Sequence, residues 1–187
     1  MHAKSYVNSF TNSKNLACFA VKSLSNISIL KIIKDMGCGF DIVSGGELHR
    51  ALSIGADPKK IIFSGVGKTR NEIEQGIKND ILSFNVESSS ELYNIERIAK
   101  DINSSAPVSI RINPDIDSGG HDYITTGRKG DKFGISSIEE IFELSKYSAN
   151  SKNLNLVGLA CHIGSQILDL DGYMESANKI FGMCNCS

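Results

Sequence analysis

Short runs of apolar residues alternate along the chain with longer amphipathic segments. Apolar runs that end in Gly, Ser, Asn or Asp are typical of buried strands, and the helical periodicity that follows them is typical of surface helices. The six runs that we predict to be strands are LACFAVK (16–22), GFDIV (39–43), KIIFSG (60–65), LSFNVE (82–87), VSIRIN (108–113) and LVGLACHIG (156–164). The chain is therefore predicted to repeat a unit of one strand and one helix.

The predicted helices carry apolar residues on one face, as helices that cover a sheet do. These faces are Ile29, Ile33 and Met36 in the first helix, Leu48, Ala51 and Leu52 in the second, and Leu92, Ile95 and Ala99 in the fourth. Helix starts are marked by a Ser or Thr with a Glu three residues later, the spacing of a capping box. These pairs are Thr69 with Glu72, Ser88 with Glu91 and Ser136 with Glu139.

Strands that are buried on both faces and followed by helices form a parallel sheet, which closes as a (β/α)8 barrel or stays open as a doubly wound sheet. No GxGxxG motif follows the first predicted strand, although Gly45 and Gly46 open the second helix. The usual dinucleotide site of an open sheet is thus missing, which favours an α/β barrel. The segment FSGVGKTRNE is no nucleoside-triphosphate loop, because Ile62 stands where that loop needs a glycine.

The 187 residues, 41% of them hydrophobic and 22% charged, have the composition of one globular domain. With 20 basic and 21 acidic residues, the chain has no overall attraction for nucleic acid or a membrane surface, so we expect a small-molecule ligand. The five cysteines include no CxxC pair, which indicates reduced thiols. Neither a signal peptide nor a membrane span is recognisable, and we expect a cytoplasmic protein.

Lys22 is the last residue of an apolar predicted strand and is therefore expected at the mouth of the barrel, where barrel enzymes keep their active sites. A partly desolvated lysine amine is a plausible Schiff-base nucleophile toward an aldehyde cofactor. The alternative is a lysine that extends to water from a strand end, and position alone favours this alternative.

Asp41, Glu47 and Arg111 are expected at the same rim, because all three lie near strand ends. Each has a structural alternative. Glu47 has capping-box spacing from Ser44, and Asp41 and Arg111 could pair with each other across the strand ends, which is the arrangement that we expect.

His162 and Ser165 lie in the turn CHIGSQ at the end of the sixth predicted strand. An imidazole can stack on a pyridine ring, and a serine beside free backbone N–H groups can bind a phosphate. A single histidine is more often structural, so the turn alone does not establish a cofactor site.

Taken together, six segments resemble the diaminopimelate decarboxylase family, in the alanine-racemase-like (fold type III) barrel group of pyridoxal phosphate enzymes. They are CFAVKSLSN, GFDIVSGGELHRAL, KIIFSGVGKTRNEI, FNVES, RINPDIDSGGHDYITTGRKGDKFGI and GLACHIGSQ, and they extend over roughly residues 15–175. The lysine strand and the HIGS turn are shared with ornithine and arginine decarboxylases, whereas FDIVSGGEL, FSGVGKT and HDYITTGRKGDKFGI resemble the diaminopimelate branch.

The resemblance implies pyridoxal 5′-phosphate as cofactor, with Lys22 as the Schiff-base lysine, His162 stacked on the cofactor ring and Ser165 as a phosphate ligand. No metal site is expected. The residues that the resemblance assigns to cofactor binding are Lys22, Asp41, Arg111, His162 and Ser165, with Glu47 in a supporting role.

The implied reaction is decarboxylation of meso-2,6-diaminopimelate to L-lysine, a carboxy-lyase step of lysine biosynthesis, by a homodimer when the enzyme is complete. The alternatives are a non-catalytic barrel that carries the cofactor and a decarboxylase of ornithine, arginine or carboxynorspermidine. The family has eight strands and a β-rich carboxyl-terminal domain, so residues 1–187 are expected to form a partial barrel, truncated at both ends. An open barrel leaves strand edges unpaired, and we expect the 187-residue chain to be inactive on its own.

Overall fold

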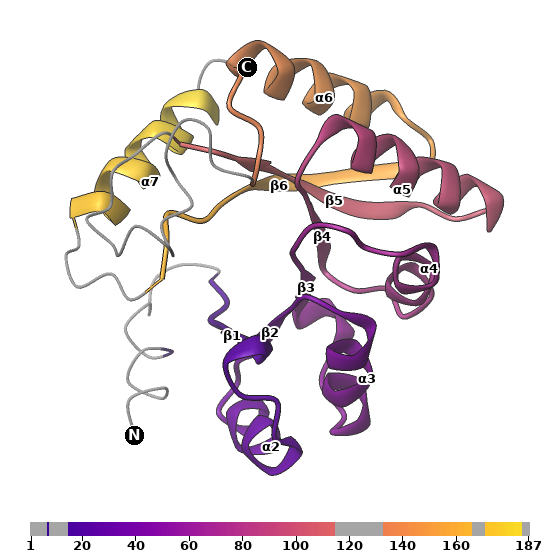
Figure 1. Ribbon diagram of the computed structural model, residues 1–187, viewed down its shortest axis with the longest axis vertical. Helices are drawn as coiled ribbons and strands as arrows, with labels where there is room; N and C mark the ends of the chain where they lie inside the picture. Colours follow the sequence, from indigo (N-terminus) through magenta and orange to yellow (C-terminus); the bar gives the residue numbers. More distant parts are fainter. Residues whose placement is uncertain (1–6, 8–14, 115–132, 166–170, 185–187) are drawn as a thin grey trace.

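Six parallel strands form one sheet whose spatial order follows the sequence (Figure 1). The computed structural model describes residues 7, 15–114, 133–165 and 171–184. The strands are β1 (Cys18–Ala20), β2 (Gly39–Ile42), β3 (Ile61–Phe63), β4 (Ser83–Val86), β5 (Ala106–Ile112) and β6 (Leu154–Cys161). The helices are α2 (Ile27–Asp35), α3 (Gly45–Ser53), α4 (Arg70–Lys78), α5 (Ser89–Asp101), α6 (Ile138–Asn150) and α7 (Asp171–Cys184), with 3-10 turns at Val21–Ser23 and Pro58–Lys60.

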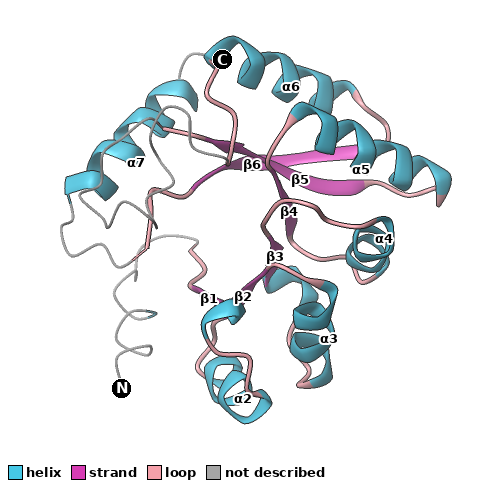
Figure 2. Cartoon of the chain, viewed as in Figure 1, coloured by secondary structure: helices cyan, strands magenta, loops and turns pink. Residues whose placement is uncertain are grey.

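The strand order decides between the two parallel architectures. A doubly wound sheet starts in its middle and reverses direction, whereas here each strand pairs with the one before it in the sequence. Helices α2 to α6 lie along the outer side of the curved sheet (Figure 2). The predicted α/β barrel architecture and the six predicted strands are confirmed.

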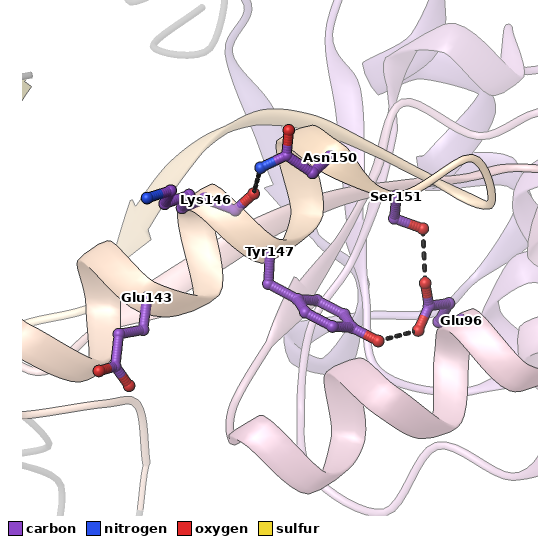
Figure 3. A pocket seen from close by; sticks show the side chains of 6 residues that line it. All are labelled: Glu96, Glu143, Lys146, Tyr147, Asn150 and Ser151. Carbon is purple, nitrogen blue, oxygen red and sulfur yellow. Dashed lines mark hydrogen bonds between the residues drawn. The ribbon is translucent and has the colours of Figure 1, made fainter.

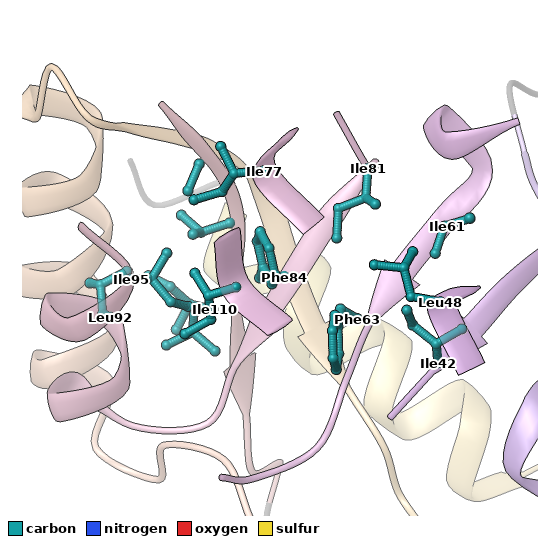
Figure 4. Packing of buried hydrophobic residues seen from close by; sticks show 14 of the residues in the cluster. Ile42, Leu48, Ile61, Phe63, Ile77, Ile81, Phe84, Leu92, Ile95 and Ile110 are labelled. Carbon is teal, nitrogen blue, oxygen red and sulfur yellow. The ribbon is translucent and has the colours of Figure 1, made fainter. Parts of the chain in front are cut away.

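The core lies between the sheet and these outer helices (Figure 4). Alternate residues of each strand face the helices, as the period of two requires. Phe63 of β3 and Phe84 of β4 are fully buried there, with ring centroids 5.9 Å apart. The intervening residues of the strands face the concave side of the sheet. Asp41 of β2 and Ile62 of β3 therefore lie side by side on this inner surface.

Side-chain caps begin most of the helices. Thr69 and Glu72 form the predicted reciprocal capping box at α4. The prediction of Ser136 as the cap of α6 is wrong by one residue, because Ser137 is the residue that accepts the backbone N–H of Glu140.

The predicted apolar face of α2 is also shifted. Leu30 is the fully buried residue of this helix, whereas Ile29 is 37% exposed. The prediction failed because α2 is apolar on most of its surface, and periodicity identifies a buried face only when the other face is polar. No described helix is long and apolar enough to cross a membrane.

Candidate cofactor site

A cavity of about 770 Å³ opens at the carboxyl ends of the strands. Its lining residues come from all six strands and from the turns that follow them. They are Ala20, Lys22, Asp41, Val43, Ile62, Ser64, Gly65, Val66, Asn85, Arg111, Phe133, Ala160, Cys161, His162 and Ser165. The five residues predicted to bind the cofactor therefore all face one cavity.

Lys22 lies on the 3-10 turn Val21–Ser23, directly after β1 rather than inside the strand. The turn buries Val21 completely and leaves Lys22 exposed, so the expected partial desolvation of this lysine is not observed. The amine is at the rim of the cavity, where a bound molecule can reach it.

Asp41 of β2 is held by a hydrogen bond from Ser64, which follows the neighbouring strand β3 and is itself bound by Asn85 of β4. Ser64 Oγ donates to Asp41 Oδ1 over 2.6 Å, and Asn85 Nδ2 donates to Ser64 Oγ over 2.9 Å. Burial raises the pKa of the Asp41 carboxyl, while the hydrogen bond from Ser64 and the nearby positive charges act against this shift.

Arg111 of β5 pairs with Glu87 and not with Asp41, so the predicted pairing is wrong. Arg111 Nη1 lies 2.7 and 3.0 Å from the two carboxylate oxygens of Glu87. Glu87 follows β4, the direct neighbour of β5, whereas Asp41 is three strand spacings away, each of about 4.8 Å. The ring of Phe133 lies against the guanidinium, with its centroid 5.3 Å from Arg111 Cζ.

His162 follows β6 and is half-buried at the cavity. Burial lowers the pKa of its imidazole, and the positive charges of Arg111 and Lys22 lower it further. The ring is therefore neutral near pH 7. Ser165 is exposed beside it, after a glycine whose φ of 138° suits a sharp turn.

Glu47 does not line the cavity. Its backbone N–H donates to Ser44 Oγ over 3.2 Å, and its carboxylate accepts the N–H of Val43 over 2.7 Å. These contacts agree with the prediction that Ser44 and Glu47 cap α3. The Glu47 carboxylate binds the backbone N–H of Val43, one residue before the cap residue Ser44. Glu47 fixes the turn that leads from β2 into α3.

Among the residues at or near the cavity that were not predicted, four have polar or aromatic side chains that contact its predicted residues or line it, namely Ser64, Asn85, Glu87 and Phe133. A usable signal was present for the first three, because each lies in the last three residues of a predicted strand. Phe133 gave no such signal, because it is far from any predicted strand end.

A second cavity, of about 500 Å³, lies on the outside of the molecule between α5 and α6 (Figure 3). Tyr147 and Ser151 both donate to the carboxylate of Glu96. The hydrogen bond from Tyr147 to Glu96 raises the pKa of Tyr147 to about 12. Three of the polar side chains that line this second cavity, Glu96, Tyr147 and Ser151, thus bind one another. Within the described part of the chain, no cluster of His, Cys, Asp and Glu could hold a metal ion, and Cys18, Cys38 and Cys161 form no disulfide.

Comparison with known proteins identifies the family. Residues 1–186 match the family described as pyridoxal-dependent decarboxylase, pyridoxal binding domain. Diaminopimelate decarboxylase of Haemophilus influenzae is 45% identical over 179 residues, and that of Pseudomonas aeruginosa is 42% identical over 180 residues. Each alignment covers 96% of this chain but 43% of the relative, so the chain spans less than half the length of these curated relatives.

The similar solved structures agree with this result. Diaminopimelate decarboxylase of Helicobacter pylori, complexed with L-lysine, superposes with a TM-score of 0.95 at 44% identity, over 99% of this chain and 47% of that one. An arginine decarboxylase of Paramecium bursaria Chlorella virus, at 23% identity and a TM-score of 0.76, shares the fold. The chain therefore belongs to the pyridoxal-dependent decarboxylases, whose pyridoxal binding domain its residues 1–186 match.

Proposed function

We propose that the full-length protein containing this chain decarboxylates meso-2,6-diaminopimelate to L-lysine with pyridoxal phosphate as cofactor. The observation that carries the proposal is the convergence of Lys22, Asp41, Arg111 and His162 on one cavity. The relatives named above, diaminopimelate decarboxylases at 42–45% identity, support the choice of substrate.

The residues present fit this cofactor. The cavity of about 770 Å³ lies within the usual range of small-molecule sites, about 300–1,000 Å³. It offers an amine, a neutral imidazole and a guanidinium, which suit an aldehyde, an aromatic ring and an anionic oxygen respectively. When bound, pyridoxal phosphate supplies a ring that accepts the electrons left behind as carbon dioxide departs.

We assign the roles as follows from the family resemblance and the positions in the cavity. Lys22 would hold the aldehyde group through its amine, and His162 would hold the aromatic ring as a neutral imidazole. Ser165 binds the phosphate, because its hydroxyl follows a tight turn at the cavity rim. Asp41 and Arg111 bind the polar edge of the ring.

Glu47 supports the site from outside. Its bonds to the turn between β2 and α3 keep the end of β2, and with it Asp41, in place. We further propose that residues 1–187 form part of a pyridoxal-binding barrel domain, and that the complete protein is a cytoplasmic homodimer. Light scattering of the purified full-length protein tests the dimer.

Covalent trapping tests the cofactor assignment. The full-length protein, purified with pyridoxal phosphate, should be yellow, and borohydride should attach a pyridoxyl group that mass spectrometry locates on Lys22. Lys22→Ala should abolish the attachment. Lys59→Ala is the matched control, because Lys59 pairs with Asp80 on the surface. Attachment to another residue would refute the assignment.

Product analysis tests the substrate. The full-length protein should release carbon dioxide from meso-2,6-diaminopimelate with formation of L-lysine, and should not turn over ornithine or arginine at a comparable rate. Turnover of ornithine without turnover of diaminopimelate would exclude the proposed reaction while leaving the cofactor assignment intact.

A further inference from the structure

Lys68, in the loop between β3 and α4, has a side chain that is 1% exposed. Its ammonium donates to the carbonyl of Gly65 over 2.6 Å, to the carbonyl of Asn85 over 2.9 Å and to Glu91 Oε1 over 2.7 Å. All three donors of the ammonium are therefore used. Lys68 does not line the cavity, so its burial serves something other than direct ligand contact.

The second carboxylate oxygen of Glu91 continues the chain of contacts. It accepts the backbone N–H of Glu87 over 2.7 Å. The Glu87 side chain, 3% exposed, accepts the N–H of Gly65 over 3.2 Å and both contacts from Arg111 Nη1. Glu91 thus holds the backbone of Glu87, and Gly65 of the β3–α4 loop holds its side chain.

This network, defined by Lys68, Glu91, Glu87 and Arg111, connects three successive strand ends and finishes at the cavity. Buried ion pairs are poor stabilisers, since apolar residues of similar size often serve as well or better. What such a pair does provide is a fixed geometry. An arginine side chain has many rotamers, and an immobile acid whose two oxygens both lie within hydrogen-bond distance of Nη1 leaves it few.

We propose that Glu87 is a positioning residue that, backed by Glu91 and Lys68, fixes the guanidinium of Arg111 in the orientation that binds the cofactor. This inference rests on the proposed function, in which Arg111 contacts pyridoxal phosphate. Glu87 itself is not among the residues that line the cavity, so it acts through Arg111.

The test uses the full-length protein and the dissociation constant of pyridoxal phosphate, measured by absorbance titration of the cofactor-free form. Glu87→Gln keeps the shape and one acceptor oxygen but removes the charge. We expect the cofactor to bind about 10- to 100-fold more weakly, the loss typical when an outer partner stops orienting a binding side chain. Glu74→Gln is the matched control, because Glu74 forms exposed ion pairs on α4, and it should leave binding unchanged.

A double-mutant cycle separates positioning from general destabilisation. In an Arg111→Lys background, Glu87→Gln should weaken binding by less than about twofold, because its effect passes through the guanidinium. A merely structural effect would appear as the same factor in both backgrounds, and that outcome would overturn the proposal. Melting temperatures of the cofactor-free variants, recorded in parallel, identify any loss that comes from unfolding.

The two proposals fail in different ways. If the unmutated protein binds no pyridoxal phosphate, the proposed function is wrong. If it binds and Glu87→Gln binds equally tightly, only the positioning inference is wrong. Should Glu87→Gln not fold, Glu91→Gln, which keeps an acceptor for the Glu87 N–H, replaces it in the same cycle, and equal factors in both backgrounds again overturn the inference.

Discussion

At the scale of single residues, the inner side of the sheet is organised by hydrogen bonds between neighbouring strands. Ser64 stands between Asp41 and Asn85 and binds both. A carboxylate in this position is costly to ionise, because the one hydrogen bond from Ser64 replaces only part of its hydration. The cavity therefore contains an acid whose proton affinity depends on its neighbours.

Asp41→Asn should make the cofactor-free protein more stable at neutral pH. Because burial raises the pKa of Asp41 above 3.8 in the folded state, the folded state binds more protons than the unfolded state between that value and the raised one. The free energy of unfolding thus falls as pH rises through this window, and asparagine removes this loss. Urea unfolding at about pH 7 and about pH 4 should show the gain at the higher pH only.

Asp35→Asn provides a control of opposite sign. Hydrogen bonding to Lys34 lowers the pKa of the exposed Asp35. Loss of the Asp35 carboxylate should therefore slightly destabilise the protein at neutral pH. A stabilisation by both substitutions would show that the effect is not specific to the buried carboxyl.

Lys68→Met should be strongly destabilising. It leaves the partly buried carboxylate of Glu91 without its cation, a change that costs about 3–5 kcal/mol in buried pairs. The double variant Lys68→Met/Glu91→Leu should recover part of this loss in urea unfolding. Lys59→Met, which breaks the exposed pair with Asp80, should change the free energy of unfolding by less than about 1 kcal/mol. Equal losses for both lysines would contradict the burial argument.

The pairing of charges was the part of the site that the sequence predicted worst. Lys22, Asp41 and Arg111 could be placed at the rim because each lies near the end of a predicted strand. The partner of Arg111 could not, since a pairing depends on which strands are neighbours, and strand order is a property of the folded sheet. Once the order is known, Glu87 is the acid on the neighbouring strand end.

At the scale of elements, contact between α4 and β4 is unusually close. A Cβ atom added to Gly76 of α4 would lie 2.5 Å from Cζ of Phe84. The absence of a side chain at this position lets the helix approach the sheet and lets Phe84 fill the space beneath it. The Phe63–Phe84 stack in the core depends on that approach.

Gly76→Ala should lower the free energy of unfolding by about 1–3 kcal/mol, because the methyl group overpacks the core at Phe84. Helix propensity alone would predict a gain of about 0.8–1.0 kcal/mol. Gly182→Ala in α7 is the matched control, since nothing lies within 4 Å of the added atom, and it should stabilise. Chemical unfolding of both variants checks the sign, and a stabilised Gly76→Ala would refute the contact.

Elements were predicted well where apolar and polar positions contrast. The buried residues of α5 include Leu92, Ile95 and Ala99, as periodicity predicted. The face of α2 was misjudged because its outer surface is apolar as well, with Ile32 50% exposed. The carboxyl ends of the strands were predicted one to three residues too late, because turn residues such as Val21 are as apolar as the strands before them.

At the scale of the whole molecule, the helices differ in how much apolar surface they bury against the sheet. Helix α2 buries a single residue, whereas α5 buries four. The sequence could not predict this difference or the barrel order, because both parallel architectures repeat the same strand–helix unit. The missing GxGxxG motif and the family resemblance, rather than the strand–helix pattern, favoured the barrel.

Hydrogen exchange should follow this difference. In the full-length protein, amides of α5 and of β4 should exchange most slowly, and those of α2 among the fastest of the described helices, since few buried contacts resist their opening. Deuterium uptake measured by mass spectrometry on peptides of each element checks this order. Equal protection of α2 and α5 would show that another surface covers α2 in the complete protein.

The sequential order of the strands also bears on how the protein is made. Every strand after the first finds its partner in the segment synthesised just before it, so no finished pair must reopen to admit a later strand. A chain emerging from the ribosome can assemble the sheet in the order in which it is translated. As the sheet grows, the most recently added strand offers an unpaired edge, as β1 does at the other end, and a chaperone would protect the nascent protein at these edges.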